Sequence, residues 1–141
     1  MMVAAMAEKS RRKQRKDPVR RNTTQRDAIQ EVFCNEERPL AVEEILRAGR
    51  KRVKSLNRAT VYRSLRMLID QGWLEAISSP KTGTLYERAG KDHHHHFQCR
   101  SCDRTYELPG CGLKQDRLTP QGFVTEGHEL FLFGICASCK R

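Results

Sequence analysis

Two Cys-x-x-Cys motifs constrain the fold of this chain more than any other feature of its sequence. Cys99 and Cys102 form the first motif, and Cys136 and Cys139 form the second, close to the C-terminus. Four thiolates from two such motifs are the tetrahedral ligand set of a closed structural zinc site. Zinc would then tie the last strand of a C-terminal sheet to its first strand, with a binding free energy on the order of 10 kcal/mol. Disulfides or unconnected thiols are the competing interpretations.

The metal interpretation depends on a reducing compartment. No stretch approaches the ~18 apolar residues of a membrane helix, and the apolar residues 3–7 are too few for a secretory signal core. We therefore expect a cytoplasmic protein with no membrane partner, in which thiols stay reduced. Paired Cys-x-x-Cys motifs in that setting indicate metal more often than disulfides.

The charge distribution favours a polyanionic partner. The chain has 141 residues and a formal net charge of +10. Residues 1–26 contain nine Lys or Arg and two acidic residues, so most of the excess charge lies there. Residues 1–20 also lack hydrophobic periodicity and are predicted to form a flexible basic arm. Such a concentration of positive charge favours nucleic acid, although a solubilising tail would have a similar composition.

Hydrophobic periodicity predicts three helices and a β-hairpin in the first part of the chain. The first helix is expected to start at the hydroxyl caps Thr23 and Thr24, and the next two to span residues 42–51 and 58–71. Asn57 is the predicted N-cap of the third helix, and Gly72 its terminator. Residues 73–77 and 84–87 are the predicted strands. This order is typical of a winged helix-turn-helix domain.

Two features of these helices concern function. The third helix carries Arg58, Tyr62 and Arg63 on the faces opposite its apolar stripe, where such side chains suit phosphates and base edges. Cys34 follows Phe33 in the first helix and is expected to be a small buried residue.

The second part of the chain is predicted to be a small sheet with little helix. Strands are expected at residues 97–99, 104–108, 123–125 and 128–133, with one or two helical turns at 113–118. The segment 128–133 is apolar on both faces, which predicts burial on both sides. In so small a module, one of those faces is expected to meet another chain.

Four consecutive histidines, His93 to His96, directly precede the first Cys-x-x-Cys motif. On a strand-like segment, His93 and His95 point to one side and His94 and His96 to the other. One run can therefore contribute to two metal sites. A solvated polyhistidine stretch or an engineered tag is the alternative interpretation.

The order of these motifs resembles the ferric uptake regulator (Fur) family of bacterial metal-dependent repressors, including its zinc-uptake-regulator branch. The resemblance rests on Arg58-Ala59-Thr60-Val61-Tyr62-Arg63, on the histidine run leading into Cys99-Arg100-Ser101-Cys102, and on Cys136-Ala137-Ser138-Cys139. It implies an α+β fold with a winged-helix DNA-binding domain at 21–88, a hinge at 89–92, and a metal-binding α/β dimerisation domain with structural zinc at 93–141. It also implies a homodimer that binds an AT-rich inverted repeat in double-stranded DNA.

The resemblance further implies which residues form each site. An interdomain sensor site would use Glu87, His94, His96 and Glu107, and a site in the dimerisation domain would use His93, His95, His128 and an acidic residue. The family's glutamate falls here either on Lys114, which cannot serve as a ligand, or on Cys111. We expect Cys111 to be the fourth ligand, with a free loop thiol as the alternative. Tyr62 and Arg63 would approach bases, and Arg21 would enter the minor groove. A histidine ligand common in the family is missing from Arg38-Pro39-Leu40-Ala41.

The function expected from this resemblance is a metal-responsive repressor of metal-homeostasis genes. It would not be an enzyme and would have no small-molecule organic substrate; no HExxH motif indicates a hydrolytic zinc centre. Beside structural Zn²⁺ it would bind a regulatory divalent metal, Zn²⁺ or Fe²⁺, with zinc favoured because thiolate is a soft donor. An iron or peroxide sensor of the same fold is the alternative. A zinc-ribbon RNA-binding module is the alternative from another class.

Overall fold

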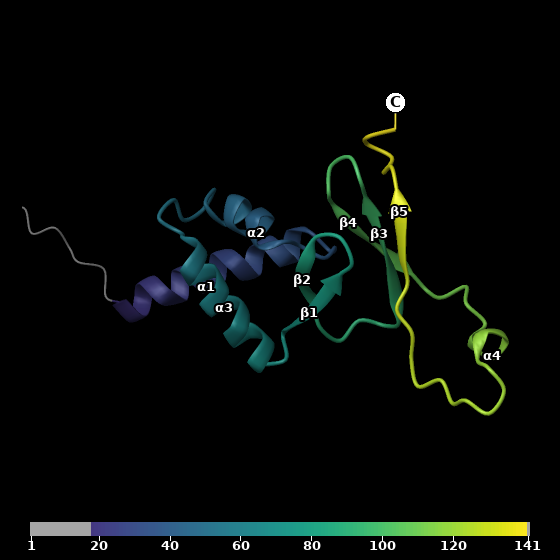
Figure 1. Ribbon diagram of the computed structural model, residues 1–141. Helices are drawn as coiled ribbons and strands as arrows, with labels where there is room; N and C mark the ends of the chain where they lie inside the picture. The colour runs from purple at the N-terminus through teal and green to yellow at the C-terminus, as the bar shows by residue number, and fades with distance from the viewer. Residues whose placement is uncertain (1–17, 141) are drawn as a thin grey trace, which may run out of the picture.

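The computed structural model describes residues 18–140, with the side chains of 18–21 left out. The predicted basic arm falls mainly on residues 1–17, outside the described residues, and so does the side chain of Arg21. In chain order the elements are α1 (Pro18–Asn35), α2 (Val42–Gly49), α3 (Arg58–Asp70), β1 (Leu74–Ser79), β2 (Gly83–Arg88), β3 (His94–Cys99), β4 (Thr105–Pro109), α4 (Gln115–Leu118) and β5 (Phe131–Gly134). The helices α1–α3 gather at one end of the molecule and the sheet β3–β5 at the other, with the hairpin β1–β2 between them (Figure 1).

Local capping signals account for the second and third helices. The Asn57 side chain accepts a hydrogen bond from the Thr60 amide at 2.9 Å, which confirms it as the N-cap of α3. Glu44 reaches back to the Ala41 amide at 2.9 Å and caps the start of α2. The first helix starts earlier than predicted, at Pro18, because proline fits the first helical position and the threonines then continue the helix.

One hydrophobic core holds the three helices and the hairpin together. Its members are buried side chains from α1, α2, α3 and both hairpin strands, including Ile29, Phe33, Ile45, Leu65, Leu68 and Leu74. The hairpin pairs in register from Leu74 opposite Arg88 to Ser79 opposite Gly83. A further bridge joins Leu40, between α1 and α2, to Tyr86. The strand β2 is therefore fixed to the helices along its middle.

The second sheet has the order β4-β3-β5, with β3 antiparallel to β4 and parallel to β5. The strand predicted at residues 123–125 is wrong: those residues form no strand, and Phe123 and Val124 are exposed. A strand needs a neighbour, and no described strand pairs with this segment. Within one chain β5 is only partly covered, since Leu132 and Phe133 are exposed by 46% and 42%. That one face of β5 meets another chain stays a prediction.

The described helices give no sign of a membrane span. None of those in residues 18–140 has the length and apolar character needed to cross a bilayer.

Candidate metal centres

The four cysteine sulfurs form one cluster at the end of the C-terminal sheet. Cys99 ends β3, Cys102 lies in the next turn, and Cys136 and Cys139 lie in the turn after β5; their sulfurs lie within 4.8 Å of one another. The Cys102 and Cys136 sulfurs are 3.9 Å apart. The sulfurs of a tetrahedral zinc site lie about 3.8 Å apart, whereas a disulfide brings them to about 2 Å. All four are free thiols, and their arrangement fits zinc.

Hydrogen bonds favour the ionised thiolate at Cys99 and Cys136, whereas at Cys139 a hydrogen bond from Ser101 lowers the pKa but the neighbouring cysteines and burial raise it to about 11 overall. Backbone N–H groups of Cys102 and Cys136 lower the pKa of Cys99 to about 6. The Tyr106 hydroxyl donates to Cys136, which lowers the pKa of Cys136 and raises the pKa of Tyr106 to about 12. Because thiolate is the ligand form of cysteine, these contacts prepare the site for a cation.

A second cluster joins the hairpin to the C-terminal sheet. Glu87 lies on β2, while His94 and His96 lie on β3. The Glu87 carboxylate is 3.1 Å from Nε2 of His94 and 3.3 Å from Nε2 of His96, and only 2% of Glu87 is exposed. Burial by itself would raise the pKa of Glu87, but the hydrogen bond from His96 and the charge of His94 lower it below its usual value. The carboxylate is therefore held ionised in a buried position.

The orientation of His94 indicates that this cluster needs a cation. Its Nδ1 lies 2.8 Å from the Asp92 carbonyl, which can only accept, so Nδ1 carries the hydrogen. The other ring nitrogen then faces the Glu87 carboxylate, and either a proton or a metal must lie between them. Burial lowers the pKa of His94, but the Asp92 carbonyl and the charge of Glu87 raise it above its usual value overall. A divalent cation would satisfy the same atoms without the proton.

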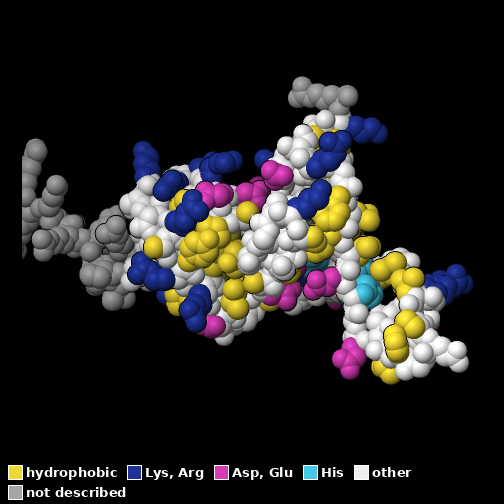
Figure 2. Space-filling view, in the orientation of Figure 1, with side chains coloured by type: hydrophobic (Ala, Val, Ile, Leu, Met, Phe, Trp, Pro, Cys, Tyr) yellow, Lys and Arg dark blue, Asp and Glu magenta, His cyan; other side chains and the backbone are white. Residues whose placement is uncertain are grey.

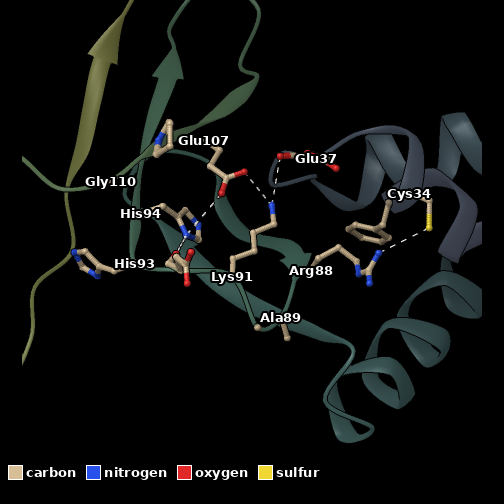
Figure 3. A pocket seen from close by; sticks show the side chains of 13 residues that line it. Cys34, Glu37, Arg88, Ala89, Lys91, His93, His94, Glu107 and Gly110 are labelled. Atoms are coloured by element: carbon tan, nitrogen blue, oxygen red, sulfur yellow. Dashed lines mark hydrogen bonds and ion pairs between the residues drawn. The ribbon is translucent and has the colours of Figure 1, made fainter.

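Glu107, expected as the fourth ligand of this cluster, is engaged elsewhere. It lies on β4, with Oε1 at 3.8 Å from Nδ1 of His94. Its other oxygen forms an ion pair with Lys91 at 3.0 Å, as Figure 3 shows. The ligand cluster among the described residues contains Glu87, His94 and His96, and Glu107 stands beside it.

The third cluster is made of His93, His95, Cys111 and His128, whose ligand atoms lie within 4.8 Å of one another. The Cys111 sulfur is 3.1 Å from Nε2 of His95 and 3.2 Å from Nε2 of His128. Burial and the neighbouring histidines lower the pKa of His95, which favours its neutral, metal-binding form. One thiolate and three imidazoles at these distances fit a four-coordinate zinc ion.

Gln115 positions His128 and was not anticipated from the sequence. Its side-chain oxygen lies 2.8 Å from Nδ1 of His128, so Nδ1–H donates to it and Nε2 remains free for metal. Gln115 begins α4, whereas His128 lies in the irregular segment before β5. No sequence pattern marks a lone glutamine as the partner of so distant a histidine.

The segment lacking the family histidine has a structural role instead. Arg38 pairs with Glu36 and Glu44, each at 2.7 Å. Leu40 is buried and pairs with Tyr86 of β2. These contacts fix the connection between α1 and α2 to the hairpin, and none of them supplies a metal ligand.

The exposed face of α3 presents the residues expected to contact DNA. Tyr62 is 48% exposed, and Arg58 is exposed beside Glu43 of α2, with which it forms an ion pair. Arg63 is also exposed and reaches the Thr60 hydroxyl at 3.3 Å. Figure 2 shows Lys and Arg side chains distributed over this helical end, as binding to a polyanion requires.

The expectation that Cys34 is buried is wrong. Cys34 is exposed, with its sulfur 3.8 Å from the Arg88 guanidinium. The buried stripe of α1 runs through Ile29, Val32 and Phe33, so the next residue is turned away from the core.

The profile of the ferric uptake regulator family matches residues 19–133. The ferric uptake regulation protein of Campylobacter jejuni is 33% identical over 85 residues, which are 58% of this chain and 54% of that protein. The zinc uptake regulation protein of Mycobacterium tuberculosis is 28% identical over 123 residues, 85% of this chain and 95% of that protein. A structure of the Helicobacter pylori ferric uptake regulator, described as having three functional metal binding sites, superposes with a TM-score of 0.60 at 25% identity and covers 83% and 80% of the two chains.

Proposed function

Because the chain belongs to the ferric uptake regulator family of metal-responsive transcription regulators, we propose that it is a zinc-responsive repressor of metal-homeostasis genes. Members of this family bind DNA as dimers and are not enzymes. The observation that carries the choice of zinc is the cluster of Cys111 with three histidines. Relatives named for iron and for zinc are both similar to this chain, so the choice rests on ligand chemistry.

Ligand softness favours zinc in that cluster. Thiolate is a soft donor that zinc accepts readily, whereas manganese and magnesium prefer carboxylate, carbonyl and water ligands. The three imidazoles suit zinc as well, and a set of four protein ligands matches its tetrahedral preference. The cluster therefore supports a zinc-loaded regulatory form, in addition to structural zinc at the four cysteines.

The cluster of Glu87, His94 and His96 is the proposed sensor because its ligands come from both halves of the chain. Metal bound there would favour the arrangement in which the hairpin lies against β3. A change from mostly open to mostly closed requires a difference in binding free energy of about 5.5 kcal/mol between the two arrangements. In the closed dimer, Tyr62 and Arg63 would face bases in the major groove, Arg58 a phosphate, and Arg21 an AT-rich minor groove.

Parallel metal titrations of DNA binding test this proposal. Duplexes would be selected from a random pool in the presence of zinc, iron(II) or manganese(II) separately, and binding then titrated with each buffered metal. We expect zinc to promote binding at a free concentration at least about tenfold below that of the other metals, or 1.4 kcal/mol. DNA binding promoted by iron(II) at a free concentration equal to or below that of zinc would contradict a zinc-responsive repressor. Preference for single-stranded RNA over every duplex would instead favour an RNA-binding module.

An iron or peroxide sensor is the second candidate, and one observation favours it. Two histidines and one carboxylate, the donors of the Glu87 cluster, are also a ligand set of non-haem iron(II). Peroxide sensing would add an oxygen atom to a ligand histidine. Peptide mass spectrometry after treatment with iron(II) and peroxide checks this, and unmodified His94 and His96 would exclude it.

A further inference from the structure

Lys91 connects the two halves of the molecule beside the proposed sensor cluster. It lies in the segment between β2 and β3, and its ammonium group donates to the Glu107 carboxylate of β4 at 3.0 Å. The same nitrogen lies 3.4 Å from the carbonyl oxygen of Glu37, which follows α1. Figure 3 shows these two contacts converging on one side chain. The side chains of Lys91 and Glu107 are exposed by only 20% and 25%, so the pair is partly shielded from water.

Glu107 lies beside the proposed sensor cluster, so its ion pair with Lys91 affects whether Glu107 can bind a metal there. Glu107 and His94 line the same cleft of about 770 Å³ between α1, the connecting segment and β4. Its Oε1 lies 3.8 Å from Nδ1 of His94, on the side of the ring away from Glu87, so the carboxylate must swing toward Nε2 to join a metal held by the Glu87 cluster. Because Lys91 holds the other oxygen, Oε2, that movement would draw the carboxylate away from the ammonium group and weaken the ion pair. Metal and lysine therefore compete for one carboxylate.

We propose that Lys91 withholds Glu107 from the sensor metal and thereby sets the metal preference of this site; this inference rests on the proposed function of the Glu87 cluster. Zinc can complete a four-coordinate shell with Glu87, His94, His96 and one water. Manganese(II) favours an oxygen-rich octahedral shell and gains more from a second carboxylate. A metal that recruits Glu107 must first separate it from Lys91, whereas a metal that does not recruit it avoids that cost. Lys91 consequently disfavours manganese(II) relative to zinc.

The test compares metal affinities in Lys91→Gln, which removes the charge, and Lys91→Arg, which keeps it. Lys54→Gln, on the exposed loop between α2 and α3, is the control for losing one positive charge elsewhere. All proteins are full length, retain structural zinc and carry both Cys111→Ser and His128→Ala, which leaves the third cluster two of its four ligands and makes the Glu87 cluster the stronger remaining site. Manganese(II) binding is measured by electron paramagnetic resonance of the free ion, and zinc binding by competition with a chromophoric chelator.

We expect Lys91→Gln to tighten manganese(II) binding about tenfold while zinc affinity changes by less than about threefold. Lys91→Arg and Lys54→Gln should remain close to the parent protein. Adding Glu107→Gln to Lys91→Gln should remove the gain, because the freed carboxylate is its source. Unchanged manganese affinity, equal tightening of both metals, or a gain that persists without Glu107 would overturn the proposal.

The outcome also separates this inference from the proposed function. DNA binding that depends on iron or manganese and not on zinc would contradict a zinc-responsive repressor. The effect of Lys91 on Glu107 would still be measured by the ratio of manganese(II) to zinc affinity in the Lys91 variants. Absence of any binding that depends on Glu87 would overturn both, and Glu87→Ala in the same background measures that dependence.

Discussion

His94 is placed by contacts on both of its ring nitrogens, and this placement makes it a metal ligand candidate on physical grounds. The Asp92 carbonyl fixes the hydrogen on Nδ1, and the buried Glu87 carboxylate attracts a cation to Nε2. His96, two residues further along the same face of β3, approaches the same carboxylate. The three side chains form a set that is complete only with a cation among them.

Removing one of these ligands should weaken the metal response without dissociating the dimer. We expect Glu87→Ala and His96→Ala each to raise the zinc concentration needed for DNA binding by about 100-fold or more, because loss even of an outer-shell partner costs 10–100-fold. Gel-shift titration with buffered zinc measures the response, and sedimentation the dimer. Asp70→Ala, on the exposed end of α3, is the control. An unchanged response in both variants would remove this cluster from the sensor role.

Cys111 allows a matched comparison with Cys34, since both thiols are exposed and lie outside the four-cysteine cluster. Cys111→Ser should weaken zinc binding at the histidine cluster by at least about tenfold, because a hydroxyl replaces the soft thiolate donor. Cys34→Ser should leave it unchanged. Competition with a zinc chelator measures both. Equal affinities for the two variants would show that Cys111 is a free loop thiol.

Strand β3 organises the second half of the molecule through its alternating faces. His94, His96 and Gln98 share the face toward the hairpin, whereas His93 and His95 face the segment that carries α4. Gln98 is buried and links the hairpin by two hydrogen bonds of 2.9 Å, from the Ser79 hydroxyl and to the Thr82 hydroxyl. One face of β3 therefore holds the hairpin both by candidate metal ligands and by an amide.

The Gln98 contacts should stabilise the arrangement of hairpin and sheet independently of metal. Gln98→Ala would leave the hydrogen of the buried Ser79 hydroxyl without its acceptor, and we expect a loss of about 1–3 kcal/mol in the free energy of unfolding. Urea denaturation with structural zinc in place measures it. Gln121→Ala, at an exposed position, should change stability little. A Gln98 variant as stable as that control would contradict a linking role.

The molecule as a whole leaves apolar surface uncovered at the end that carries the sheet. Phe123, Val124, Leu132 and Phe133 are exposed, and Figure 2 shows hydrophobic side chains gathered over the segment around α4. Lys and Arg side chains appear at both ends of the molecule in this view. The exposed apolar side chains fit a dimer that joins through the sheet end and presents two helical ends to DNA.

A charge placed on that apolar surface should dissociate the dimer without unfolding the chain. Val124 is 86% exposed, so Val124→Asp disturbs no packing within one protomer. We expect dimer dissociation to become at least about 30-fold more favourable, or 2 kcal/mol. Sedimentation equilibrium measures it, with Asn22→Asp as a charge-matched control on α1. A dimer of unchanged strength would place the interface elsewhere.

The sequence by itself determined the elements and the ligand types, because these depend on neighbouring residues. Helical periodicity and the Asn57 cap located α3, strand alternation divided the four histidines into two sets, and the Cys-x-x-Cys spacing predicted a four-sulfur cluster. The prediction of a strand at residues 123–125 was wrong, because a segment with a β-strand pattern forms a strand only where a neighbouring strand pairs with it.

Only the tertiary structure decided which partner each isolated polar side chain takes. Glu107 pairs with Lys91, Gln115 orients His128, and Gln98 joins the hairpin, although nothing in the local sequence distinguishes the partners of these residues from those open to any other polar side chain. A lone carboxylate or amide has several possible partners in sequence. Packing of segments far apart in the chain selects among them, because an ion pair or hydrogen bond forms only where two elements bring its atoms within about 3 Å.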